Sequence, residues 1–236
     1  MDTSIDLDHR ISGIAVLDQP LRRDLYRLLS ERDGWLSRDE AAEALGLARS
    51  VAALHLDKLA EAGIVDVRFE RTSGRTGPGT GRPAKLFRRR HDELSASVPD
   101  RHYELAGSLL AAGVADAIRI GRPVADCLGA AAYAVGRRIG ERSHRDSAGQ
   151  TPDEDEIEAV TGVLARHGYE PRFGPGDAVA LVNCSFHRLA EQERPHVCRM
   201  NLDFVNGIID GIGRSRRLTA RLAPERGYCC VRLTVT

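Results

Sequence analysis

The sequence predicts an α+β protein built from more than one domain. Helical spacing of apolar residues and helix-capping signals occur through most of the first 62 residues. Two strand patterns then enclose a stretch rich in glycine and proline. In the last quarter of the chain, strand patterns alternate with a helix pattern. The chain has 236 residues, of which 42% are hydrophobic and 29% charged, so it can bury a core and is long enough for two ordinary domains.

Three helices are expected near the N-terminus. Apolar residues at helical spacing follow a first-turn proline and predict a helix over residues 19–30. Ser37 and Glu40 have the spacing of a capping box, which predicts a second helix up to about residue 45. Gly46 then allows a tight turn into a third helix over residues 48–62.

A basic hairpin follows these helices. Residues 64–69 alternate as a strand does, residues 73–83 are too rich in glycine and proline for regular structure, and residues 84–88 resume a strand. Between Val67 and His91 the chain carries eight lysines and arginines against one acid, whereas the whole chain has a net charge of +0. Three helices followed by a hairpin with a basic loop form a winged helix-turn-helix, in which the third helix enters the major groove of DNA.

Four stretches resemble bacterial winged-helix regulators of the ArsR/DeoR-like type, and the resemblance covers roughly residues 11–91. The stretches are Leu17–Arg23, Ser37–Ala42, His55–Gly63 and Gly81–Leu86. The resemblance implies that the third helix faces the groove and that the hairpin contacts phosphate or the minor groove. The DNA-binding residues that it implies are Arg49, Ser50, Ala53, His55, Lys58, Arg75, Arg82 and Lys85.

The sequence in the middle of the chain predicts two long, alanine-rich helices. They are expected over residues 103–120 and 124–142, separated by Gly121-Arg122-Pro123. Small residues permit close helix packing, so these helices could form a dimer interface or cover a sensor domain. The sequence therefore predicts a winged helix-turn-helix domain at 1–92, a helical linker and dimerisation region at 93–145, and an α+β sensor domain at 146–236.

Cysteines gather in the expected sensor domain. Strands are predicted at 178–183, 218–223 and 228–235, with a helix at 197–212. Four cysteines with the spacing C-x13-C-x30-C-C lie at the ends of these elements, with His187 near the first: Cys184, Cys198, Cys229 and Cys230. Because adjacent strand residues point to opposite faces, one cysteine of the final pair is expected to face a common site. Buried, unreactive cysteines are the alternative.

The C-terminal half is similar to SufR-type repressors, which are winged-helix regulators of iron–sulfur cluster assembly. The residues that carry this similarity are Asn183–Ala190, Val197–Asn201 and Cys229–Val231, and the same half also looks like the vinyl-reductase-like small-molecule-binding domains. The similarity implies a 2Fe-2S or 4Fe-4S cluster held by cysteines, with Cys229 favoured over Cys230 and the fourth ligand left open. His187 keeps a zinc site as an alternative.

The sequence thus predicts a homodimeric transcriptional regulator that binds double-stranded operator DNA under the control of an iron–sulfur cluster. Control by zinc or by a small organic ligand is the alternative. No CxxC, P-loop, Rossmann or catalytic-triad signature is present, so we expect no enzymatic activity. The chain also lacks a signal-peptide pattern and an apolar run long enough to span a bilayer, which predicts a cytoplasmic protein without a membrane partner.

Overall fold

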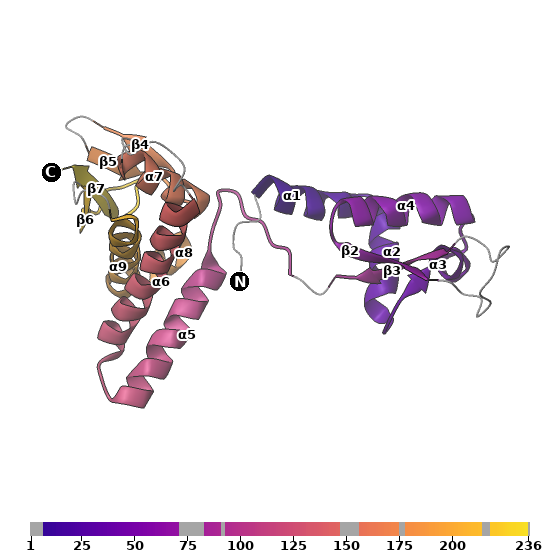
Figure 1. Cartoon of the computed structure of the whole chain (residues 1–236), viewed down its shortest axis with the longest axis horizontal. Helices are drawn as coiled ribbons and strands as arrows, with labels where there is room; N and C mark the ends of the chain where they lie inside the picture. The colour runs from indigo at the N-terminus through magenta and orange to yellow at the C-terminus, as the bar shows by residue number, and fades with distance from the viewer. Residues whose placement is uncertain are drawn as a thin grey trace. The chain divides into compact units, whose positions relative to one another are not determined.

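The structure is a computed structural model that describes residues 7–70, 83–90, 93–146, 156–174, 178–213 and 218–235. The chain divides into two compact units, one ending at Ala96 and the other beginning at Ser97 (Figure 1). The helices expected to form a separate middle region belong to the second unit. The three-part division at residues 92 and 145 remains a prediction.

The first unit contains helices and a small sheet. Its elements are α1 (Leu7–Ala15), the 3-10 turn η1 (Val16–Asp18), α2 (Pro20–Glu31), β1 (Leu36–Ser37), α3 (Arg38–Leu45), α4 (Arg49–Glu61), β2 (Val65–Glu70) and β3 (Ala84–Arg89). The strands are antiparallel in the order β1-β3-β2, so β3 is central and β2 and β3 form the expected hairpin. Helix α1 and strand β1 were not predicted.

Local signals explain where these helices begin and end. The amide of Ser37 donates to Glu40 Oε2 over 2.8 Å and the amide of Glu40 donates to Ser37 Oγ over 3.2 Å, which confirms the capping box. Gly46 has a φ of +63°, a conformation that glycine adopts without strain, and it ends α3 as expected. Pro20 stands in the first turn of α2 as expected, and the Gln19 side chain caps this helix by accepting a hydrogen bond from the amide of Arg22 over 2.8 Å.

The core of the first unit fixes which face of α4 points outward. Ala52, Leu56 and Leu59 have no exposed surface, as their spacing predicts. They pack with residues of α2 and with Phe87 of β3. Burial of leucine or phenylalanine contributes about 1.5–3 kcal/mol each, so this face is held inward and the other face of α4 is available for contacts.

The second unit consists of long helices packed on an antiparallel sheet. Its elements are α5 (Tyr103–Ile120), α6 (Val124–Asp146), α7 (Glu156–Arg166), β4 (Pro171–Phe173), β5 (Ala178–Leu181), α8 (His187–Gln192), α9 (Arg194–Ile212), β6 (Leu218–Leu222) and β7 (Val231–Val235). The strand order is β4-β5-β7-β6. Helix α9 lies at the centre of the unit, where it contacts α6 and the sheet (Figure 1).

Glycines allow α6 and α9 to cross with their backbones in contact. A Cβ atom on Gly207 would overlap the carbonyl oxygen of Tyr133, and one on Gly211 would overlap that of Arg137. From the other side, a Cβ on Gly136 would overlap the carbonyl oxygen of Phe204. These three glycines therefore pack α6 against α9 inside the unit.

We expect Gly207→Ala to lower the free energy of unfolding by about 1–3 kcal/mol, because the added methyl group must push α6 away from α9. Chemical denaturation followed by circular dichroism measures this. Gly162→Ala in α7 is the control, since its Cβ would meet only the end of the Arg166 side chain at 3.6 Å and it should gain about 0.5–1 kcal/mol. Equal stability of the two variants would contradict the close crossing.

Candidate functional site

The outward face of α4 carries most of the residues predicted to contact DNA bases. Arg49, Ser50 and Lys58 are exposed, whereas Ala53 and His55 are half-buried. The Nδ1 atom of His55 is buried and has no hydrogen-bond partner among the described residues. The first turn of α4 therefore presents the more accessible part of this surface, and the contacts of all five residues with DNA remain predictions.

The cations on this surface are paired with acids. Arg49 forms an ion pair with Asp39 of α3, and Lys58 Nζ lies 2.7 Å from Glu61 Oε2. All four side chains are at least half exposed, and exposed pairs of this kind contribute only about 0–1 kcal/mol. Phosphate or a base edge can therefore replace the carboxylate partner at little cost.

Lys85 of β3 joins the hairpin to α4. Its ammonium group donates to Asp57 Oδ1 over 2.5 Å and lies 5.3 Å from the centre of the Phe87 ring. Only 22% of its side chain is exposed. Its predicted contact with phosphate is untested. In the structure its ion pair with Asp57 has another role, because it holds β3 against α4. Arg75 and Arg82 lie outside the described residues.

Trp35 organises two further arginines that sequence reasoning missed. The guanidinium carbons of Arg68 and Arg88 lie 4.5 and 4.7 Å from the centre of its ring. Leu36 pairs with Phe87 and Arg68 with Leu86, which places the indole beside this face of the hairpin. The available signal was a single tryptophan followed by two strands that each carry an arginine, Arg68 and Arg88, but the two-residue strand β1 that aligns them has no sequence pattern.

In the second unit, the four cysteines form two pairs that share the Cys229-Cys230 dipeptide. Cys198 of α9 is disulfide-bonded to Cys230, with Cα atoms 6.2 Å apart. Cys184, which follows β5, shares a hydrogen bond with the buried thiol of Cys229. Strand β7 begins at Val231 and not at residue 228, so the strand alternation that we expected does not govern Cys229 and Cys230. Each of the two has a different cysteine partner, and which of them faces a common site remains a prediction.

A buried polar chain leads from Tyr169 to the free cysteine pair. The Tyr169 hydroxyl donates to Asn201 Oδ1, and Asn201 Nδ2 donates to Cys229 Sγ over 3.2 Å. Tyr169 and Asn201 are each 1% exposed. Asn201 stands one turn beyond Cys198 on α9, so this helix contacts both cysteine pairs.

The two free thiols differ in acidity. The hydrogen bond that Cys229 donates lowers the pKa of Cys184, whereas the same bond, together with burial, raises the pKa of Cys229. Burial also raises the pKa of Tyr169, which keeps its hydroxyl protonated and able to donate to Asn201. The pair thus gives up its first proton from Cys184, and the resulting thiolate is the nucleophilic or metal-binding form.

His187, the histidine proposed as a further ligand, is not brought together with the cysteines. It lies at the start of α8, half exposed, with Nε2 3.2 Å from Glu191 Oε1. Within the ranges that the structure describes, no group of three or more His, Cys, Asp or Glu residues is placed to hold a metal ion.

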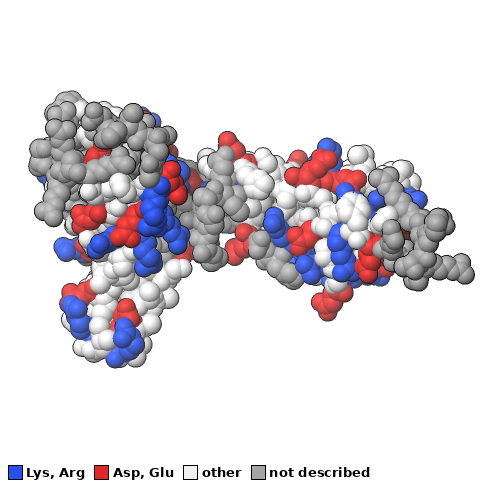
Figure 2. Space-filling view, viewed as in Figure 1, with Lys and Arg blue, Asp and Glu red and all other residues white. Residues whose placement is uncertain are grey.

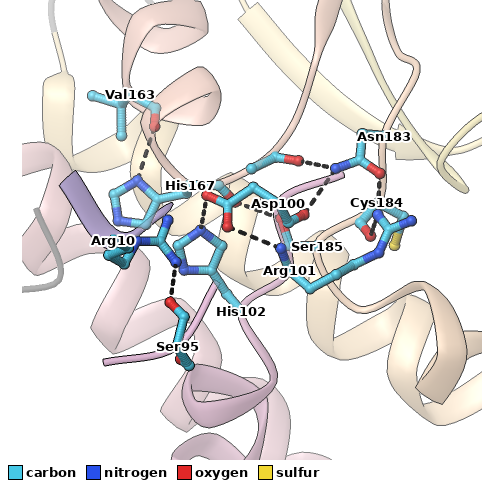
Figure 3. A network of polar contacts seen from close by, with 11 residues as sticks. Arg10, Ser95, Asp100, Arg101, His102, Val163, His167, Asn183, Cys184 and Ser185 are labelled. Atoms are coloured by element: carbon cyan, nitrogen blue, oxygen red, sulfur yellow. Dashed lines mark hydrogen bonds and ion pairs between the residues drawn. The ribbon is translucent and has the colours of Figure 1, made fainter. Parts of the chain in front are cut away.

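The Cys184 loop is tied to the first residues of the second unit. Arg101 Nη1 donates to the carbonyl oxygen of Cys184 over 2.8 Å and also to Asn183 Oδ1, while Asn183 Nδ2 donates to the carbonyl oxygen of Asp100 over 2.9 Å (Figure 3). The amide of His102 donates to the carbonyl oxygen of Ser185 over 3.1 Å. Residues 100–102 are therefore hydrogen-bonded to the loop that carries Cys184 through both side chains and backbone.

Histidine rings continue this network. His102 Nε2 lies 3.3 Å from Asp100 Oδ2, and the His102 and His167 rings are 5.9 Å apart between centroids. His167 Nδ1 lies 2.8 Å from the carbonyl oxygen of Val163, which assigns the proton to Nδ1 (Figure 3). Burial lowers the pKa of His167, so the neutral ring is favoured in the folded protein.

Comparison with known proteins supports the function of the first unit. Residues 17–68 match the sequence profile of a family described as a helix-turn-helix domain. The chain therefore carries a DNA-binding domain of the kind found in transcription regulators. No curated protein and no solved structure matches the chain. Among the described residues, no helix is long and apolar enough to cross a membrane.

We expect Asn201→Leu to lower the free energy of unfolding by about 1–3 kcal/mol, because the buried Tyr169 hydroxyl then loses its acceptor. The matched control is the double variant Asn201→Leu/Tyr169→Phe, which removes the orphaned hydroxyl and should recover most of the loss. Denaturant unfolding of the reduced proteins measures both effects. A double variant less stable than Asn201→Leu would show that the hydroxyl is satisfied in another way.

Proposed function

We propose that the protein is a transcriptional regulator whose affinity for operator DNA is set by an iron–sulfur cluster at the cysteine pairs, and that it acts as a homodimer. The observation that carries the sensing part of the proposal is the pairing of Cys184 with Cys229 and of Cys198 with Cys230, which puts two cysteine pairs on adjacent residues of one dipeptide. The same chain carries a helix-turn-helix domain.

The donor set fits an iron–sulfur cluster in kind and in number. Iron–sulfur clusters are held by cysteine thiolates, commonly four, and the two pairs together supply four cysteines. Among the described residues no three of them surround one point as they stand, so binding requires the two pairs to approach each other. Cys184, Cys198, Cys229 and Cys230 would hold the group, which when bound supplies sensitivity to oxidants and to iron supply. Because Cys198 and Cys230 are joined in a disulfide, a reductant must supply two electrons, which releases both sulfurs as thiolates, before both can act as ligands.

The structure also offers a route from the cysteines toward the DNA-binding half of the chain. Arg101 and Asn183 bind the Cys184 loop to residues 100–102, which follow closely in sequence after the division at Ser97. A change at Cys184 that moves its carbonyl oxygen breaks or redirects these bonds. For such a change to regulate DNA binding, the two states must differ in operator affinity.

The disulfide supports a second candidate, direct sensing of an oxidant by thiols. The Cys198 and Cys230 thiols would be oxidised by a peroxide, which accepts two electrons and two protons and, if it is hydrogen peroxide, leaves as two molecules of water. The disulfide is the product of that step and needs no metal. This candidate requires reduced and oxidised protein to bind DNA with different affinities in the absence of iron.

Spectroscopy separates the two candidates. After anaerobic reduction with dithiothreitol and addition of ferrous iron and sulfide, we expect broad visible absorption with stoichiometric bound iron and sulfide. Cys198→Ser should lose this absorption, because a hydroxyl does not replace a thiolate on iron. Cys127→Ser, which changes a buried cysteine of α6 outside both pairs, is the matched control and should keep it. A colourless, iron-free wild-type protein would exclude the cluster.

DNA binding is tested separately, with the reduced full-length protein and duplexes selected from a random pool. We expect the logarithm of the binding constant to fall linearly with the logarithm of salt concentration, and Arg82→Ala to reduce that slope by about one. The control is Arg172→Ala, which removes an exposed arginine from β4 of the second unit and should leave the slope unchanged. An unchanged slope in Arg82→Ala would exclude its contact with phosphate.

A further inference from the structure

Helix α5 has an exposed apolar face in addition to its buried one. Ala106, Leu109, Gly113 and Ala117 are buried in the second unit. Next to them on the helix surface lies a second row, which we term the α5 stripe: Tyr103, Gly107, Leu110, Ala111, Val114 and Ile118. Its large members are well exposed, from 36% for Tyr103 to 80% for Ile118. An exposed row of this length is a candidate protein-binding surface.

The α5 stripe carries no charged residue. In Figure 2 the surface over most of α5 is uncharged, and charged atoms gather toward the end where α5 meets α6. A twofold axis brings only the residues close to it near their own copies, and a charged residue at such a position would repel its copy. The α5 stripe is free of this obstacle and is therefore suited to pairing with a second copy.

The order of large and small residues makes the α5 stripe complementary to itself. If two α5 helices lie antiparallel about an axis between Leu110 and Ala111, Leu110 of one copy faces Ala111 of the other. In the same register Gly107 faces Val114, and Tyr103 faces Ile118. Each of the first two contacts puts a large side chain against a small one, and such alternation lets facing helices interdigitate.

Small residues also permit the close approach that this register needs. A Cβ atom on Gly107 would meet no atom within 4 Å, so the helix backbone there is open on its outer side. The glycines that hold α6 against α9 are occupied inside the unit, whereas Gly107 and Ala111 have no such contact. The two sets of small residues therefore serve different helix pairs.

We propose that the α5 stripe is the surface through which two copies of this chain pair, with α5 antiparallel to α5 of the second copy. The inference deepens the proposed function, because a dimer presents two recognition helices to paired half-sites. It can be tested in the absence of DNA and metal, so it can fail while DNA binding stands, and the reverse also holds.

Sedimentation of the reduced full-length protein tests the pairing. We expect wild type to sediment at twice the chain mass of 25.8 kDa and Leu110→Glu to sediment at 25.8 kDa, because the glutamate would lie beside its own copy at the axis. Ala112→Glu is the matched control, since residue 112 is exposed on the other side of the same helix, and this variant should remain a dimer.

A pair of variants with opposite charges at residue 110 distinguishes loss of the dimer contact from misfolding. Leu110→Glu and Leu110→Lys should each be monomeric, and an equimolar mixture should form dimers that contain one of each. A wild-type monomer would overturn the proposal. A Leu110→Glu protein that remains dimeric, or a mixture that stays monomeric while both variants keep the wild-type circular dichroism spectrum, would place the dimer contact elsewhere.

Discussion

The contact between the backbones of α6 and α9 is the constraint on which the second unit depends. Side chains normally keep helix axes 8–10 Å apart, but Gly136, Gly207 and Gly211 let carbonyl groups of one helix touch the other. This crossing fixes the position of α9, and α9 carries both Cys198 and Asn201. The arrangement of the cysteines is therefore a consequence of helix packing as much as of the loops that carry Cys184 and Cys229.

In the first unit, ion pairs hold the candidate DNA-contacting residues in place without blocking them. Arg49 and Lys58 have exposed carboxylate partners that phosphate can replace, whereas Lys85 is largely buried between α4 and β3 with Asp57. The exposed cations and the largely buried Lys85 thus have different roles. The exposed cations are accessible to a ligand, whereas Lys85 links β3 to α4 through Asp57.

The sequence predicted those features that depend on local chemistry. The capping box at Ser37 and the turn at Gly46 follow from backbone hydrogen bonding and conformation, and the buried face of α4 follows from apolar spacing. Features that depend on distant segments escaped prediction. The cation–π contacts of Trp35 need the register between β1 and β3, and the pairing of the cysteines needs the point at which β7 begins. The strand was expected to begin at residue 228, and its later start means that strand alternation does not determine where Cys229 and Cys230 point.

The proposed sensor would join two differently supported cysteines, one on a packed helix and one in a loop. The glycine crossing makes α9 a rigid support for Cys198, whereas Cys184 stands in a loop held by side-chain hydrogen bonds from Arg101 and Asn183. The loop is also packed, because Asn183, Cys184, Ser185 and Phe186 are at most 7% exposed. A chemical change at Cys184 therefore disturbs core packing as well as hydrogen bonds. Because Arg101 donates directly to the Cys184 carbonyl oxygen, the same change alters the surroundings of residues 100–102.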